Sequence, residues 1–289
     1  MTADPRADDW LIAPAPHLGD TYFTCALAEA FLDRHGGSRV RVVVPRRLWS
    51  VLTLFPNARV APLDPAQLEL PFREARGFRL GEPFHLRPLR FSGDFSAAYA
   101  GQTIPFTRTY HDLLELPFPA FARPCVPEAA SDAAARRLRE LGLPPRHTAI
   151  LVPVSNSGPA FSASFWVDLA GALASRGWTV TTNVAPDEAG RSIPGTAPLP
   201  CPAGELIPVA EMAGLVVASR CGVCDLLSSA RTDLRILYHR PQYEWSPLAG
   251  VKLRCDLAAC GLEDGASYYQ MGASEPRAEY IARIVAGSE

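Results

Sequence analysis

The order of apolar and polar positions predicts that the N-terminal part of the chain folds as strand, helix and strand. Residues 10–13 form an apolar, strand-like run, and residues 21–35 have apolar side chains at helical spacing. Gly36-Gly37 ends this helix, and residues 40–44 and 60–63 predict further strands. Since a strand, a helix and a strand in this order form a parallel pair, the pattern predicts a parallel sheet.

A second unit of the same kind begins near residue 147. Residues 148–154 predict a buried strand, residues 164–176 a helix that Gly177 ends, and residues 178–184 the next strand. The remaining pattern predicts helices at 206–213, 222–230 and 275–285, and strands at 215–218 and 234–239.

The region between these two units differs in composition. Residues 64–127 are rich in Pro, Phe and Arg, and the pattern predicts one helix there, at 107–116. A later helix, with Ser131 as its N-cap, ends at Gly142, and Pro144-Pro145 after it is typical of a linker. We therefore predict an α/β protein of two Rossmann-like domains, residues 1–145 and 146–289, facing each other across a cleft. Ligands in such sheets bind at the carboxyl ends of the strands.

Composition and charge narrow the kinds of molecule that the protein is expected to bind. The 28 basic and 30 acidic residues give a formal charge of −2 and are spread along the chain, so we expect no nucleic acid partner. No apolar run approaches the roughly 20 residues that cross a bilayer. The N-terminus is acidic where a signal peptide would be basic, so we expect a cytoplasmic protein without an integral membrane segment. Lys252, the only lysine, lacks the glycine spacing of a phosphate-binding P-loop.

The seven cysteines are odd in number and irregularly spaced, which favours reduced thiols. Two of them, Cys221 and Cys224, lie where a predicted strand meets a predicted helix. Three interpretations are open: a redox dithiol, a zinc site completed by Cys255 and Cys260, or a strand–helix turn that binds an anion. In the third, the cysteines are small buried side chains.

The anion-binding interpretation explains more of the local sequence. Gly222 lets the backbone approach a ligand closely, and the N–H groups of Gly222, Val223 and Cys224 favour an anion. Arg220, directly before the turn, supplies a charge-assisted hydrogen bond to the same anion. The alternative is an ordinary turn beside a surface arginine.

Five segments, in this order and spacing, resemble the heptosyltransferase-like GT-B glycosyltransferases, the ADP-heptose:LPS heptosyltransferase family. They are residues 17–24 (HLGDTYFT), 150–153 (ILVP) with the loop after it, 165–170 (FWVDLA), 183–188 (NVAPDE) and 219–226 (SRCGVCDL). Two of these segments depart from the family pattern, and in the last one Arg220 and Cys221 stand at the Asp and Ser/Thr of the family motif while Gly222 is kept. Ser164 stands at the family's lysine, and Asp225 stands at the histidine of its Asp-Ser/Thr-Gly-x-x-His motif.

The resemblance implies a metal-independent, inverting transfer of a sugar from a nucleoside-diphosphate sugar to an acceptor hydroxyl. It places Asp20 as the general base, although Asp20 also suits a helix cap. The donor-binding residues that it implies are Gly19, Ser155, Asn156, Ser157, Glu188, Arg220, Gly222, Val223, Cys224 and Asp225.

The implied partners are a nucleotide-sugar donor and a small-molecule or glycan acceptor, with no further cofactor and no metal. Asp225 has three open roles: binding a sugar hydroxyl, pairing with Arg220, or favouring the start of the helix. Two other functions stay open. One is a GT-B-fold nucleotide-sugar epimerase or hydrolase, and the other is a dithiol or zinc protein.

Overall fold

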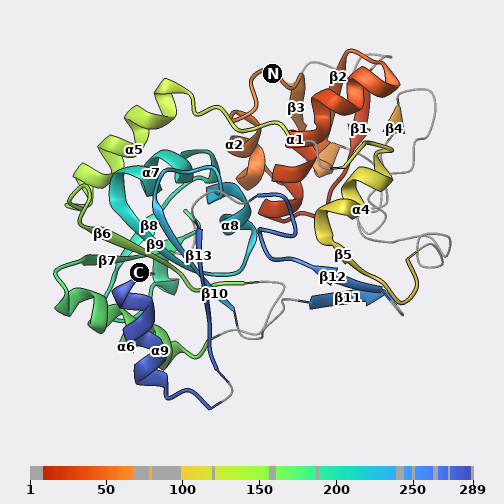
Figure 1. Cartoon of the computed structure of the whole chain (residues 1–289). Helices are drawn as coiled ribbons and strands as arrows, with labels where there is room; N and C mark the ends of the chain where they lie inside the picture. Colours follow the sequence, from red (N-terminus) through yellow and green to blue (C-terminus); the bar gives the residue numbers. More distant parts are fainter. Residues whose placement is uncertain are drawn as a thin grey trace. The chain divides into compact units, whose positions relative to one another are not determined.

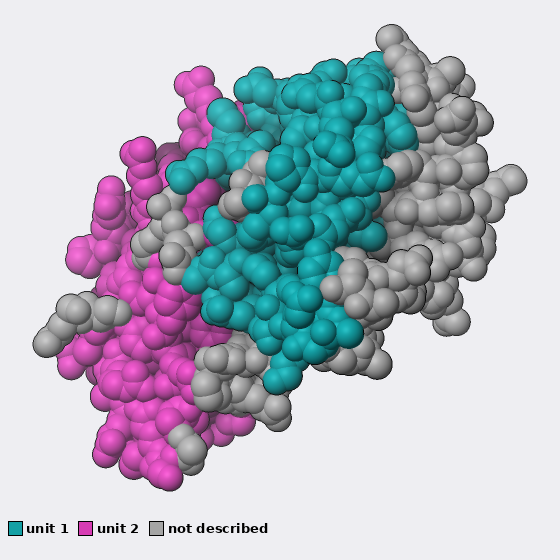
Figure 2. Space-filling view, turned by 45° about the vertical axis from the view of Figure 1, so that its right-hand side comes forward, with its two compact units in different colours: residues 1–125, 244–261 teal, residues 126–243, 262–289 magenta. Residues whose placement is uncertain are grey.

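A computed structural model describes residues 9–67, 78–79, 99–118, 121–155, 161–186, 189–238, 244–248, 251–262, 266–272 and 274–287 (Figure 1). The chain divides into two compact units. Unit 1 comprises residues 1–125 and 244–261, and unit 2 comprises residues 126–243 and 262–289 (Figure 2). Of the described residues, no helix is long and apolar enough to cross a membrane.

Unit 1 contains the strand–helix–strand arrangement predicted for the N-terminal part. Its four-stranded sheet has the order β3-β2-β1-β4. β1, β2 and β3 are parallel, and β4 is antiparallel to β1. The bounds of these strands and of the helices between them are β1 Asp9–Ile12, α1 Leu18–His35, β2 Arg39–Val43, α2 Trp49–Leu52, β3 Val60–Leu63 and β4 Phe78–Arg79.

Helix α1 begins at Leu18, three residues earlier than the apolar spacing predicted, and the N–H of Thr21 donates to the carbonyl of His17. The helix is buried on more than one side, because α2 and α4 (Phe106–Leu113) pack on it as well as β2. Phe23, fully buried, contacts the rings of Phe106 and Tyr110. Contacts from several directions explain why nearly the whole first half of α1 is inaccessible to water.

A second, three-stranded sheet completes unit 1 with residues from distant parts of the chain. β5 (Thr103–Pro105) pairs in parallel with β12 (Val251–Arg254), which pairs antiparallel with β11 (Glu244–Leu248). Ile104, Val251 and Leu253 form a small buried cluster between them. The sequence pattern predicted none of these three strands, because each is short and its partners are remote in sequence.

Unit 2 is built on a six-stranded, all-parallel sheet of order β13-β10-β9-β6-β7-β8. The chain runs outward from β6 to β8 and then returns to place β9 on the other side of β6. The strand order therefore reverses between β6 and β9. The strand bounds are β6 Thr148–Val152, β7 Thr179–Val184, β8 Ala197–Pro200, β9 Gly214–Ser219, β10 Asp233–Tyr238 and β13 Ala266–Gln270.

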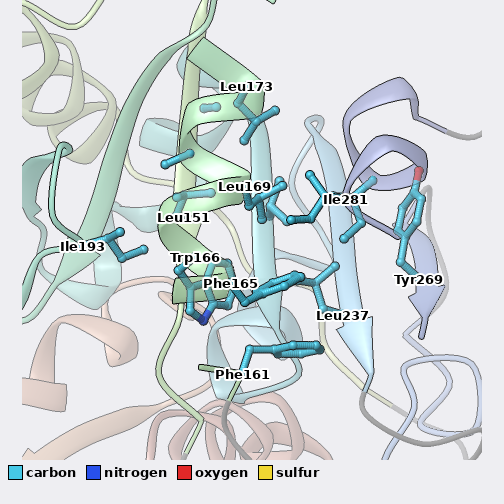
Figure 3. Packing of buried hydrophobic residues seen from close by; sticks show 14 of the residues in the cluster. Leu151, Phe161, Phe165, Trp166, Leu169, Leu173, Ile193, Leu237, Tyr269 and Ile281 are labelled. Carbon is cyan, nitrogen blue, oxygen red and sulfur yellow. The ribbon is translucent and has the colours of Figure 1, made fainter. Parts of the chain in front are cut away.

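Helices cover both faces of this sheet (Figure 1). α6 (Ala163–Ser175) and α9 (Arg277–Ala286) pack together on one face. Trp166 (Figure 3) and Tyr280 are the largest fully buried side chains there. On the other face α7 (Leu206–Ala213) packs against β6 and β9, and α5 (Glu128–Glu140) packs against α7. The short helix α8 (Gly222–Leu227) follows β9 directly.

The compact units divide at residue 125 rather than at the expected 145. α5 belongs to unit 2, because Arg137 forms an ion pair with Glu205 at 2.9 Å, and Pro144-Pro145 lies within that unit. The prediction that Ser131 caps α5 is wrong. The helix begins at Glu128, since the carbonyl of Pro127 accepts hydrogen bonds from the N–H groups of Ala130 and Ser131.

A buried ion pair ties β1 to β2 in unit 1. The Arg41 guanidinium lies 2.9 Å from the Asp9 carboxylate, and both side chains are at most 5% exposed. We expect Arg41→Ala to lower the free energy of unfolding by about 3–5 kcal/mol, because the Asp9 charge stays buried without its arginine. Arg46→Ala is the matched control, since Arg46 pairs with Asp64 but is 76% exposed. Urea unfolding followed by circular dichroism checks this, and equal losses in the two variants would contradict it.

Candidate functional site

The reversal of strand order brings two distant loops of unit 2 together. β6 and β9 pair in parallel, with Val152 beside Ala218, so the segments that follow them leave the sheet at the same edge. The hydroxyl of Ser155 donates to the carbonyl of Arg220 at 2.8 Å. In open α/β sheets ligands bind at this crevice, outside the carboxyl ends of the strands where the order reverses. Two segments that the sequence assigned to the donor thus meet at the expected position.

Three of the predicted donor residues, Asn156, Ser157 and Glu188, lie outside the described residues. Gly222, Val223 and Cys224 form the first turn of α8, and Cys221 is its N-cap with an extended backbone. Gly19 is buried in the first turn of α1, in unit 1.

Arg220 is not the surface arginine that the alternative interpretation expected. Its side chain is 6% exposed, and its guanidinium lies 2.5 Å from the equally buried carboxylate of Asp225. The same guanidinium also donates to the carbonyl of Cys221 at 2.7 Å. Of the three roles open for Asp225, the structure shows pairing with Arg220. The positive charge of Arg220 is therefore neutralised inside the turn.

Burial shifts the pKa of Asp225. Removal from water raises the pKa of Asp225, and the neighbouring Arg220 charge and its hydrogen bond oppose that rise. The pair thus fixes the backbone of the turn from inside. Within the turn the N–H of Cys224 donates to the carbonyl of Cys221 at 2.9 Å.

Two buried polar groups, which the sequence did not single out, lie near the same edge. Within the described residues, the hydroxyl of Ser219 and the indole N–H of Trp166 have no hydrogen-bond partner, although both residues are at most 3% exposed. Ser219 is the last residue of β9, and Trp166 lies in the first turn of α6, beside Phe161 (Figure 3). A buried donor without a partner costs about 1–3 kcal/mol, which a ligand can recover.

In unit 1, Asp20 occupies the third position of α1 and is 7% exposed. The Tyr110 hydroxyl of α4 donates a hydrogen bond to its carboxylate. The capping alternative for Asp20 is wrong, because the N-cap of α1 is His17. The sequence pattern predicted the helix that contains Tyr110 but gave no signal of its contact with Asp20, since the two residues are 90 positions apart.

The zinc interpretation finds no support in the structure. Over the part of the chain that the structure describes, no three His, Cys, Asp or Glu side chains gather in a metal-binding cluster. Cys221 and Cys224 belong to unit 2, whereas Cys255 and Cys260 belong to unit 1. All seven cysteines are free, as predicted.

Known proteins resemble this chain in structure but not in sequence. No protein-family model matches the chain, and no curated protein matches it by sequence. Among solved structures, Escherichia coli ADP-heptose LPS heptosyltransferase II matches with a TM-score of 0.60 at 12% identity, over 96% of this chain and 98% of that one. A glycosyl transferase family 9 structure from Veillonella parvula matches with a TM-score of 0.56 at 13% identity, over 98% and 92%.

The chain has the fold of the heptosyltransferases. A third match, the dodecameric iron-containing heptosyltransferase TibC in complex with ADP-D-β-D-heptose, has a TM-score of 0.51 at 16% identity and covers 79% of this chain and 57% of TibC. The heptosyltransferase fold is the two-domain α/β GT-B fold, so the fold class predicted from the sequence is confirmed. At these identities the likeness establishes the fold, and the chemistry has to be argued from the residues.

The Arg220–Asp225 pair predicts a stability effect. We expect Asp225→Asn to lower the free energy of unfolding by about 3–5 kcal/mol, because a buried guanidinium loses its counter-charge. Asp168→Asn is the control in the same unit, since Asp168 pairs with Arg277 at 2.7 Å but is 57% exposed. The double variant Arg220→Met, Asp225→Leu should recover part of the loss. Thermal and urea unfolding measure both effects, and a control as damaging as Asp225→Asn would refute the assignment.

Proposed function

We propose that this protein is a glycosyltransferase that moves a sugar from a nucleoside-diphosphate sugar to an acceptor hydroxyl. The observation that supports it most is the Ser155–Arg220 hydrogen bond, which joins the two donor segments where the strand order reverses. The heptosyltransferase fold supports the same conclusion, and ADP-heptose, which TibC holds in its solved complex, is the first donor to test. The cytoplasmic location expected from the sequence belongs to this proposal.

In this proposal unit 2 binds the donor. The amides at the start of α8 meet the diphosphate, and the buried Ser219 hydroxyl offers a further hydrogen bond. The family's lysine is replaced by Ser164, and a guanidinium lies beside that serine: Arg277 donates to the Ser164 hydroxyl at 3.1 Å. We assign the compensating positive charge to Arg277 rather than to Arg220. Both arginines have a carboxylate partner, but the Arg220–Asp225 pair is buried, whereas the Arg277–Asp168 pair is 36% and 57% exposed, so water weakens it and Arg277 can turn to an anion.

Unit 1 supplies the base. Asp20 accepts the proton of the acceptor hydroxyl as that oxygen attacks the anomeric carbon, and the Tyr110 hydroxyl fixes the orientation of the carboxylate. Attack in line with the departing diphosphate, without a covalent intermediate, inverts the anomeric configuration. Backbone N–H groups and Arg277 stabilise the departing charge, so the proposed scheme requires no metal ion.

Donor binding is tested by thermal unfolding with a panel of nucleoside diphosphates and nucleotide sugars, ADP and ADP-heptose among them. A ligand at about 100 times its Kd stabilises the folded protein by about 2.7 kcal/mol, so the matching nucleotide should raise Tm by several degrees. Arg277→Ala should reduce this shift. Arg283→Ala is the control on the same helix, since Arg283 pairs with Glu275 at 2.7 Å. The proposal fails if no nucleotide changes Tm.

Catalysis is tested with the best donor and a panel of glycan and small-molecule acceptors. Asp20→Asn should lower kcat by about 10²- to 10⁴-fold while the donor-induced rise in Tm is retained. Tyr110→Phe removes one hydrogen bond to the base, so we expect kcat to fall by about 10- to 100-fold. Tyr99→Phe, which removes a similar Tyr–Asp contact (2.6 Å to Asp112), is the control.

Release of nucleoside diphosphate measures these rates. Donor turnover at full rate without any acceptor would instead favour the epimerase or hydrolase alternative. Unchanged turnover in Asp20→Asn would remove Asp20 from the mechanism.

A further inference from the structure

The two cysteines of the turn after β9 differ in surroundings. Cys224 is fully buried, and its thiol donates to the carbonyl of Ser219 at 3.4 Å. Cys221 is partly exposed and occupies the N-cap position of α8. Cys224 is the third residue of α8, so its side chain and that of the N-cap residue Cys221 lie on the same side of the first turn. Cys221 is thus the more exposed residue of the pair, and Cys224 is enclosed.

The groups around the pair favour a thiolate at Cys221. Its pKa is lowered, first by the hydrogen bond from Cys224 and then, against the effect of burial, by the amide N–H of Val223 and the charge of Arg220. The pKa of Cys224 is raised, chiefly by burial. Because the two pKa values shift in opposite directions, Cys221 is the thiol that ionises and attacks, and Cys224 stays protonated.

We propose that Cys221 and Cys224 form a redox-active dithiol, in which Cys221 attacks a low-molecular-weight disulfide and Cys224 then closes an intramolecular disulfide. The places of the two residues at the N-cap and in the first turn of α8, together with their unequal burial, support these separate roles. The inference is independent of the proposed function, since it requires neither a donor nor an acceptor.

The reaction balances as a thiol–disulfide exchange. The Cys221 thiolate forms a bond to one sulfur of the small disulfide, whose S–S bond breaks and releases one thiolate that takes a proton from water. Cys224 then loses its proton to water, and its sulfur attacks the Cys221 sulfur, which releases the second small thiol. Two electrons pass from the protein to the small disulfide, which is reduced to two thiols.

The test equilibrates the full chain with mixtures of reduced and oxidised glutathione, quenches with acid, alkylates the free thiols and maps the peptides by mass. We expect a disulfide between Cys221 and Cys224, with the unalkylated chain lighter by about 2 Da because two hydrogens are lost. Cys125→Ser should behave like the wild type, since Cys125 is exposed but has no cysteine beside it in sequence. If both thiols stay reduced through the whole titration, the proposal is wrong.

Single variants separate a redox pair from two structural cysteines. Cys224→Ser should accumulate glutathione on Cys221, because the thiol that resolves the mixed disulfide is gone. Cys221→Ser should leave Cys224 unmodified, because Cys224 is buried. Equal modification of the two variants would contradict the assigned roles. Circular dichroism verifies folding, and Cys224→Ala replaces Cys224→Ser if the serine variant unfolds.

The rate of alkylation is a second measurement on the reduced wild-type protein. Iodoacetamide should react with Cys221 at lower pH than with Cys125, because the thiolate is the reactive form and the pKa of Cys221 is lowered. Cys221 reacting no faster than Cys125 below neutral pH would overturn the proposal. Neither thiol assay involves a nucleotide, so a negative result here leaves the glycosyltransferase proposal standing, and the converse also holds.

Discussion

The parallel pairing of β6 with β9 is the constraint on which the site of unit 2 depends. Every strand of the six-stranded sheet runs in the same direction, so all the segments that follow them leave at one edge. β9 lies on the opposite side of β6 from β7 and β8, so the strand order reverses at β6. In open α/β sheets ligands bind where the order reverses in this way. The hydrogen bond from the Ser155 hydroxyl to the Arg220 carbonyl joins the segment after β6 to the segment after β9.

A buried ion pair then shapes the turn after β9. Removing Arg220 and Asp225 from water is unfavourable for each alone, and their mutual attraction at 2.5 Å offsets that penalty. The pair is held within a single turn, so its contribution is local: it orients the backbone of Cys221 and the start of α8. Arg220 thus positions the turn, and in the proposed function Arg277, beside Ser164, supplies the positive charge toward the donor.

The same few residues support two chemistries in this account. In the proposed function amides at the start of α8 meet a diphosphate, and in the proposed dithiol the Val223 amide stabilises the sulfur of Cys221. A backbone that stabilises negative charge does so for a phosphate oxygen and for a thiolate alike. The interpretations of this segment as an anion-binding turn and as a dithiol are therefore compatible.

Local patterns in the sequence determined most elements of the fold. Helix α7 lies at the predicted residues 206–213, and β1, β2, β6, β7, β9 and β10 lie within two residues of their predicted bounds, because apolar periodicity reports which face is buried. The parallel sheets followed from the same patterns. The likeness to heptosyltransferases and the choice of Asp20 rested instead on the resemblance of short motifs to that family, and the role of Asp20 still has to be tested.

Contacts between residues remote in sequence were decided only by the tertiary structure. Pairing of β12 with β5 moved residues 244–261 into unit 1, and packing of α5 on α7 moved the boundary from 145 to 125. The bond from Tyr110 to Asp20, the partner of Arg220 and the surroundings of Ser219 also depend on which elements become neighbours. The spacing of apolar residues shows which face of a helix or strand is buried. Which residue that face contacts depends on how segments distant in sequence pack together.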